Sequence, residues 1–173
     1  MNAYVVDTNV PVVANGKSRQ ADLACVIACV KQLQAIYNNG MVVLDDLCLI
    51  LDEYRKHLGM SGQPGPGDGF MKWIWNNQTN PSRCEQVAIT PIGQSQDDFE
   101  EFPCDPALVN FDRKDRKFVA VALASRNQPV IVNAVDSDWA NYQTQLGNYG
   151  VRILQLCPQC CSQASGASGS ERG

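Results

Sequence analysis

The chain has 173 residues, enough for one domain with a substantial core and too few for two ordinary domains. Apolar residues make up 45% and charged residues 18%, which is typical of a folded globular protein and not of a disordered one. The net charge of −4 argues against a protein that coats nucleic acid through a broad basic surface. No segment approaches the roughly 18 consecutive apolar residues of a membrane span, and the N-terminus lacks a signal-peptide pattern. We therefore expect a cytoplasmic protein without membrane contact.

Short apolar runs alternate with helical patterns along the chain. The predicted elements are a strand at 4–6, a helix from Asp22 closed by Asn38-Asn39-Gly40, a strand at 41–44, a helix at 47–58, a short helix at 70–74, a strand at 87–89, a helix from 112 through 123, a strand at 130–132, a helix at 139–146 and a strand at 151–154. Asp45 or Asp46 can cap the second helix. Residues 59–69 contain five glycines and two prolines, which predicts a loop.

This order of elements predicts the fold class. Wholly apolar strands that alternate with helices are typical of a parallel sheet covered on both faces. We therefore expect a three-layer α/β/α fold of the Rossmann-like kind, with a central parallel sheet of about five strands. The domain is predicted to span residues 1–157. A cysteine-containing end and a flexible Ser/Gly-rich tail, from Ser162 onward, are predicted to occupy 158–173.

The eight cysteines have no obvious common role in the sequence. Without a signal peptide they are predicted to be reduced thiols, with Cys25 and Cys29 acting as small apolar residues in a helix. Cys157-Pro158-Gln159-Cys160 has the spacing of half a zinc site. The sequence shows no evident second pair, and His57 is its one histidine, so a loop that closes the last strand is the favoured interpretation.

Four acidic segments occur where a predicted strand ends or a predicted helix begins. In parallel α/β sheets ligands bind beyond the carboxyl ends of the strands, so these segments are expected to converge. Carboxylates brought together raise one another's pKa unless a cation lies between them. The sequence thus predicts a divalent metal site. The segments are Asp7-Thr8-Asn9, Asp52-Glu53, Asp112 to Asp115 and Asp136-Ser137-Asp138.

Within these segments the individual roles differ. Asp7 directly follows a buried strand, which favours a ligand over a turn cap. Glu53 lies off the apolar stripe of its helix, and a solvated helix face beside Arg55 and Lys56 explains it equally well.

The last two segments each pair a candidate ligand with a candidate cap. Asp112 is predicted to cap a helix, which leaves Asp115 as the ligand. Asp138 is predicted to cap the helix at Trp139, which leaves Asp136 as the ligand, although Asp138 stays an alternative. Asn9 and Asn133 are predicted to support the site, Asn133 by hydrogen bonding to a carboxylate or a bound water.

Taken in order over roughly residues 3–155, these motifs resemble the PIN-domain (PilT N-terminus-like) nuclease family. The resemblance lies in the apolar run into Asp7-Thr8-Asn9, in Leu49 to Tyr54, in Asp115 to Ala122 and in Asp136-Ser137-Asp138-Trp139. The chain differs at Asn133, where the family often has Ser or Thr, and in a longer 59–83 region.

The resemblance implies that Asp7, Glu53, Asp115 and Asp136 bind Mg²⁺ or Mn²⁺ and hydrolyse phosphodiester bonds in single-stranded RNA. It further implies an antitoxin-like partner or a homodimer as candidate assemblies. Basic residues beside the third acid, Arg113, Lys114, Arg116 and Lys117, are candidates to guide the phosphate backbone.

Two alternatives belong to other functional classes. A phosphotransferase with Asp7 as nucleophile is disfavoured because Asn9 stands where a second aspartate is expected. A PIN-like module that binds nucleic acid or protein without catalysis is the remaining alternative.

Overall fold

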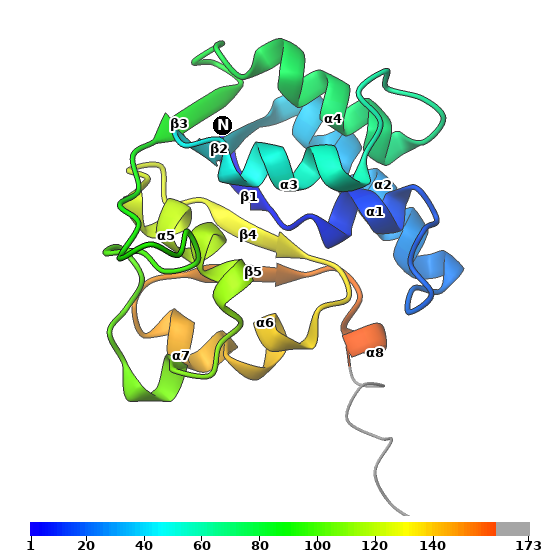
Figure 1. The fold of residues 1–173 in the computed structure, drawn as a ribbon. Coiled ribbons are helices and arrows are strands. Elements are labelled where there is room, and N and C mark those ends of the chain that lie inside the picture. The colour runs from blue at the N-terminus through cyan, green and yellow to red at the C-terminus, as the bar shows by residue number, and fades with distance from the viewer. Residues whose placement is uncertain (162–173) are drawn as a thin grey trace, which may run out of the picture.

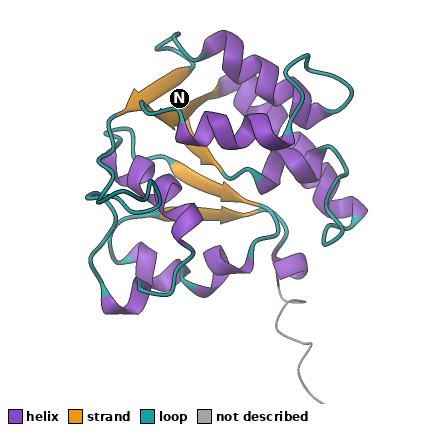
Figure 2. Ribbon diagram, viewed as in Figure 1, coloured by secondary structure: helices purple, strands orange, loops and turns teal. Residues whose placement is uncertain are grey.

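The computed structural model describes residues 1–161, in which five parallel strands form one sheet (Figures 1 and 2). The predicted three-layer α/β/α architecture is confirmed. The tail predicted from Ser162 onward lies outside the described residues. The strands are β1 (Asn2–Val6), β2 (Gly40–Asp45), β3 (Cys84–Val87), β4 (Val130–Asn133) and β5 (Arg152–Gln155), in the sheet order β3-β2-β1-β4-β5.

Helices cover both faces of the sheet. Crossovers between parallel strands are right-handed as a rule, so the direction in which the chain moves along the sheet decides which face each helix covers. The chain moves outward from β1 to β3 and then returns to β4 on the far side of β1, so the return crosses the opposite face. Accordingly α2 contacts β2 and packs on α1 and α4, whereas α5 contacts β1, β2 and β4. The helices are α1 (Asn9–Ala14), α2 (Leu23–Asn39), α3 (Leu49–His57), α4 (Pro66–Asn77), α5 (Arg116–Ala124), α6 (Ser137–Asn141), α7 (Gln143–Gly147) and α8 (Pro158–Cys161), with 3₁₀ turns η1 (Pro106–Leu108) and η2 (Arg113–Asp115).

The reversal of strand order beside β1 determines where a site can form. Strand β1 lies between β2 and β4, and Val6 pairs with Val132 in a fully buried register. The backbone N–H of Asp7 extends this pairing by donating to the carbonyl of Val132 at 3.0 Å. The ends of β1 and β4 therefore lie side by side at the switch point, where open α/β sheets bind ligands.

Most predicted elements are present, and their caps explain their limits. The side chain of Asp22 accepts a hydrogen bond from Cys25 N–H at 2.7 Å and so caps α2. Asp45 accepts from the N–H groups of Leu49 and Ile50 at 2.6 and 2.9 Å, which confirms it as the cap of α3. Helix α4 begins at Pro66, inside the predicted loop, because proline at the first helical position needs no N–H partner.

Four local predictions were wrong. Helix α1 was not predicted, since six residues are too few for a clear helical pattern. Strand β3 was predicted at 87–89 but lies at 84–87, where the polar Glu85 and Gln86 of this edge strand hide the apolar signal. The helix predicted at 139–146 is split at Tyr142 into α6 and α7, and α8 replaces the predicted closing loop at 157–161.

The cysteines also differ from the prediction. Cys25 and Cys157 form a disulfide between α2 and the segment before α8, so these two are not free thiols. The other six cysteines are free. No helix within residues 1–161 is long and apolar enough to cross a membrane.

Candidate metal centre

Asp7 is held at the end of β1 by two donors. Trp139 Nε1 donates to its Oδ2 at 2.7 Å, and the backbone N–H of Asn9 donates to its Oδ1 at 2.8 Å. The residue is only 5% exposed. Burial raises the pKa of Asp7 from 3.8 to about 7, against the lowering effect of these two bonds and with smaller contributions from Asp136 and Glu53.

Asp115 approaches Asp7 from the junction of η2 and α5. The preceding turn is capped by Asp112, whose Oδ1 accepts from Lys114 N–H at 2.9 Å, as predicted. Burial, followed by repulsion from Asp7, Asp136 and Asp112, raises the pKa of Asp115 from 3.8 to about 9. Without a bound cation this carboxyl therefore holds a proton at neutral pH.

Asp136 reaches the same point from the loop after β4. Its Oδ1 accepts from the N–H of Asp138 at 2.9 Å, so Asp136, and not Asp138, caps α6. The predicted cap at Asp138 is thus wrong, because α6 begins at Ser137, two residues earlier than expected. Asp138 instead accepts a long 3.4 Å hydrogen bond from Asp112 N–H, and burial and Asp136 raise its pKa.

Three of the predicted acids converge closely. One carboxylate oxygen from each of Asp7, Asp115 and Asp136 lies within 4.8 Å of the others, and such a group could hold a metal ion. Burial, and after it repulsion from the neighbouring acids, raises the pKa values of Asp7 and Asp115, as expected for carboxyl groups that share a site. A divalent cation among them would relieve this repulsion, and three carboxylates are hard oxygen ligands of the kind Mg²⁺ and Mn²⁺ prefer.

Glu53 lies beside this group but is occupied by other partners. Its Oε1 accepts from Thr8 Oγ1 at 2.5 Å, and its Oε2 pairs with Lys117 Nζ at 2.6 Å. Lys117 is 7% exposed, and it also donates to the carbonyl of Lys114. The structure therefore places the predicted fourth ligand next to the cluster, with its charge already balanced by a lysine.

The ion pair between half-buried Glu53 and buried Lys117 leads to a stability prediction. We expect Lys117→Met to lower the free energy of unfolding in EDTA by about 3 kcal/mol, because Glu53 then keeps an unpaired charge near Asp7. Adding Glu53→Gln should recover much of this loss. Urea denaturation of the single and double variants measures both effects.

Arg55→Met is the matched control, since Arg55 pairs with Asp52 on the exposed face of α3 and should cost less than about 1 kcal/mol. Equal losses of unfolding free energy in Lys117→Met and Arg55→Met would contradict a special role for the Glu53–Lys117 pair.

Asn9 and Asn133 support the site through the backbone of the β4–α6 loop. Asn9 donates to Asn133 Oδ1 at 2.7 Å and accepts from Ala134 N–H at 2.9 Å. The fully buried Asn133 also accepts from Asp136 N–H at 3.2 Å and donates to the Asp136 carbonyl at 2.8 Å. Within residues 1–161 Asn133 bonds no carboxylate and instead fixes the loop from which Asp136 projects, while a bond to a metal-bound water stays a prediction.

The basic residues beside the third acid have separate roles. Arg113 and Arg116 both pair with Asp98, at 3.4 and 3.1 Å, and Arg116 also lies over the ring of Phe102. Lys117 pairs with Glu53. Within residues 1–161, Lys114 is the member of this group without a carboxylate partner, so it alone of the four predicted phosphate guides faces the site without an ion pair.

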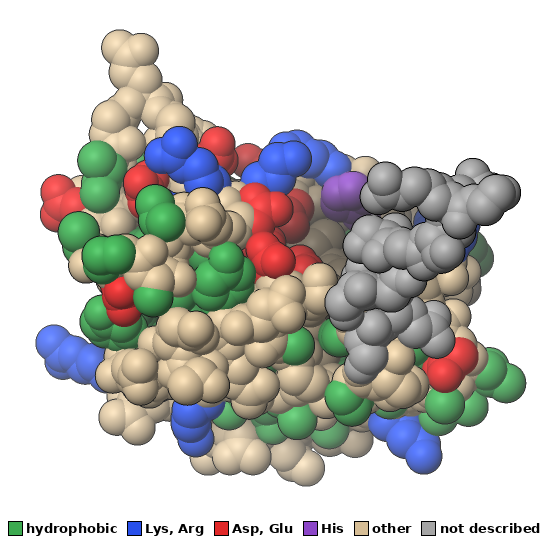
Figure 3. Space-filling model, turned by 90° about the horizontal axis from the view of Figure 1, so that it is seen from below, with side chains coloured by type: hydrophobic (Ala, Val, Ile, Leu, Met, Phe, Trp, Pro, Cys, Tyr) green, Lys and Arg blue, Asp and Glu red, His purple; other side chains and the backbone are tan. Residues whose placement is uncertain are grey.

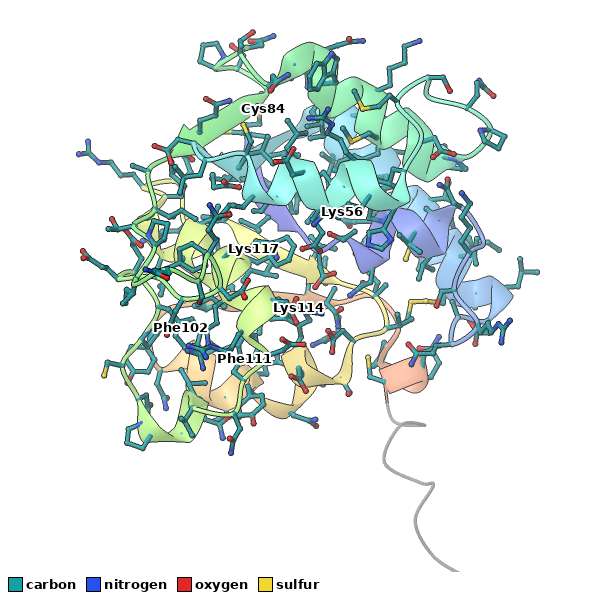
Figure 4. All side chains as sticks on the ribbon, viewed as in Figure 1. Lys56, Cys84, Phe102, Phe111, Lys114 and Lys117 are labelled. Carbon is teal, nitrogen blue, oxygen red and sulfur yellow. A yellow bond between two sulfur atoms is a disulfide. The ribbon has the colours of Figure 1, made fainter. Side chains whose placement is uncertain are left out.

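Two hollows flank the carboxylates and share Glu53, His57 and Asp136. One, of about 490 Å³, is also lined by Lys56, Lys114 and Asp115, and the other, of about 470 Å³, by Asp7, Thr8 and Asn9. Figure 3 shows the acids gathered in a depression, with basic side chains along its rim and the histidine beside them. Lys56 comes from α3 and Lys114 from η2 (Figure 4).

Comparison with known proteins found no relative of this chain. No protein-family model matches the chain, and neither curated proteins nor solved structures gave a match. The function must therefore be argued from the site itself.

Sequence reasoning missed Trp139 as an anchor of Asp7 and Lys117 as the partner of Glu53. The aromatic residue after Asp136-Ser137-Asp138 was a visible signal for the first. No local signal existed for the second, because the pair joins α3 to α5 across 64 residues of sequence.

Proposed function

We propose that the chain is a divalent-metal-dependent ribonuclease of the PIN type that cleaves single-stranded RNA. The observation that carries this proposal is the convergence of Asp7, Asp115 and Asp136 at the carboxyl edge of a parallel sheet. The order of the acidic motifs along the chain, and their resemblance to the PIN pattern, support the same assignment.

The residues present fit Mg²⁺ or Mn²⁺ better than zinc. All three converging ligands are carboxylates, and in a site free of histidine and thiolate a hard cation is preferred. Asp7, Asp115 and Asp136 would hold the ion, which supplies activation of a water nucleophile and neutralises charge on the scissile phosphate. Asp7 and Asp115, whose pKa values are raised in the ion-free protein, would act as ligands in their deprotonated form.

The other residues orient these ligands and the substrate. Trp139 and the N–H of Asn9 fix the Asp7 carboxylate, and Asn133 holds the backbone of Asp136. Thr8 and Lys117 hold Glu53 beside these ligands, and Lys117 balances its charge. Lys56 and Lys114, at the edge of the larger hollow, would contact the phosphate backbone.

The test is cleavage of end-labelled single-stranded RNA, with single-stranded DNA and duplex RNA for comparison. We expect cleavage of the single-stranded RNA in Mn²⁺ or Mg²⁺ and none in EDTA. Cleavage that persists in EDTA would contradict the metal-dependent mechanism.

Lys114→Ala should weaken RNA binding about equally for different sequences and reduce the dependence of log K on log[salt] by about one unit, since one phosphate contact is lost. Filter binding in EDTA over a range of salt concentrations measures this without cleavage. Arg55→Ala, an exposed cation on the same side of α3 as Asp52, is the control. An unchanged salt dependence for Lys114→Ala would remove Lys114 from the RNA path.

One observation favours the second candidate, a binding module without catalysis. The charge of Glu53 is balanced by Lys117, so only three of the four acids are available to a cation. Such a module would bind RNA with unchanged affinity in EDTA and would show no cleavage with any of the metals tested.

A further inference from the structure

A second group of potential ligands, made of cysteines, lies away from the carboxylates. Cys25 and Cys29 are one turn apart on α2, so both face the same side of that helix. Cys157 and Cys160 bracket the turn that begins α8, where Cys160 N–H donates to the Cys157 carbonyl at 2.9 Å. The fold thus supplies the second cysteine pair that the sequence of 157–160 lacked.

Three of these four side chains meet in the interior. The sulfur atoms of Cys25, Cys29 and Cys157 lie within 4.8 Å of one another, and all three residues are fully buried. Cys160 is 8% exposed and lies close enough to Cys29 to contribute, after burial, to raising the pKa of that thiol to about 12. Three sulfurs from two segments 132 residues apart therefore share one small volume, and the Cys-x₂-Cys spacing puts Cys160 on the turn that follows Cys157.

The disulfide uses only two of these four cysteines. It joins Cys25 to Cys157, the sulfur–sulfur bond drawn in yellow in Figure 4. Cys29 and Cys160 remain as buried free thiols. Spacings of Cys-x₃-Cys and Cys-x₂-Cys are those of tetrahedral thiolate zinc sites. In such a site Zn–S bonds of about 2.3 Å put the sulfurs about 3.8 Å apart. The sulfurs of Cys25, Cys29 and Cys157, which lie within 4.8 Å of one another, are compatible with this spacing.

We propose that in the reduced chain Cys25, Cys29, Cys157 and Cys160 bind one zinc ion as a four-thiolate structural site. Soft thiolate ligands select zinc over Mg²⁺ or Mn²⁺, so this site and the carboxylate site take different metals. The disulfide and the zinc site are mutually exclusive. Reduction of the disulfide by an added phosphine, with two electrons and two protons, gives the two missing thiols, and binding of Zn²⁺ to the four thiols releases four protons.

The position of α8 gives this site a structural consequence. Cys161 Sγ contacts the carbonyls of Ala134 and Asp136 at 3.6 and 3.8 Å, and α8 contacts α6. A metal that fastens α8 to α2 thus also supports the loop that carries Asp136.

The experiment is metal analysis of the full chain, purified with a phosphine reductant and dialysed against trace zinc. We expect about one zinc ion per wild-type chain and almost none in Cys29→Ala or Cys160→Ala. Cys84→Ala, a buried free cysteine on β3 apart from the cluster, should retain the ion (Figure 4).

Loading the reduced wild-type chain with Co²⁺ in place of zinc gives a second readout that needs no variant. Tetrahedral thiolate coordination of Co²⁺ produces intense visible absorption, which disappears when zinc displaces the Co²⁺. Absence of bound zinc and of this absorption in the reduced wild type would overturn the proposal and leave the disulfide as the cluster's role. Zinc retained by both Cys29→Ala and Cys160→Ala, or iron in place of zinc, would overturn it as well. Asp7→Asn should keep its zinc, so failure of the nuclease proposal is distinguishable from failure of this one.

Discussion

Asp7→Asn is expected to reduce metal-dependent cleavage of single-stranded RNA by more than about 100-fold, because loss of even an outer partner of a metal ligand costs 10–100-fold. The substitution keeps the volume of the side chain and one oxygen acceptor for Trp139 or Asn9, but removes the charge at the centre of the cluster. Initial cleavage rates in Mn²⁺ report the chemical step. RNA binding, measured separately in EDTA, reports the binding step.

Asp52→Asn is the matched control for this variant. Asp52 precedes Glu53 on α3 but is exposed, and within residues 1–161 its one ion-pair partner is Arg55. Its cleavage rate should equal that of wild type. Full activity in Asp7→Asn would contradict the assignment of the carboxylate cluster as the catalytic centre.

The second large effect is a loss of stability with rising pH in the metal-free protein. Folding raises the pKa of Asp7 from 3.8 to about 7 and that of Asp115 to about 9. Between pH 4 and these values the folded state binds more protons than the unfolded chain, so the free energy of unfolding falls as pH rises. Stability from these two groups is fully present below about pH 4 and is lost through about pH 9, and we expect a loss of several kcal/mol, since one pKa unit corresponds to about 1.4 kcal/mol.

Urea denaturation in EDTA at several pH values between 5 and 9 measures this slope. Asp115→Asn removes the most strongly shifted carboxyl and should flatten it, making the variant more stable than wild type at high pH. Addition of Mg²⁺ or Mn²⁺ should reduce the pH dependence of the unfolding free energy in wild type and leave that of Asp115→Asn unchanged. A slope that is the same in wild type and in Asp115→Asn would contradict the raised pKa of Asp115.

Local patterns in the sequence were sufficient for the fold and for much of the site. Wholly apolar strands alternating with helices predict a parallel sheet, and the strand ends place Asp7 and Asp136 at its carboxyl edge. The cap at Asp112 was also predictable, because capping depends on residues two or three apart.

Features that depend on long-range contact were not predictable. Whether Glu53 binds a metal or an amine depends on Lys117, which a different helix brings to it at 2.6 Å. The roles of Asp136 and Asp138 exchanged when α6 began two residues earlier than its apolar pattern indicated.

Of the four acidic segments, the sequence by itself determined their order and their placement at one edge of a parallel sheet. Only the tertiary structure decided that three of the acids meet while the fourth is paired with lysine, and that Cys25 and Cys29 converge with Cys157. The physical reason is the same in both cases. Strand ends and helix caps are fixed by neighbours in sequence, whereas a side chain's charge partner or metal ligand set is fixed by which helices pack against each other across the sheet.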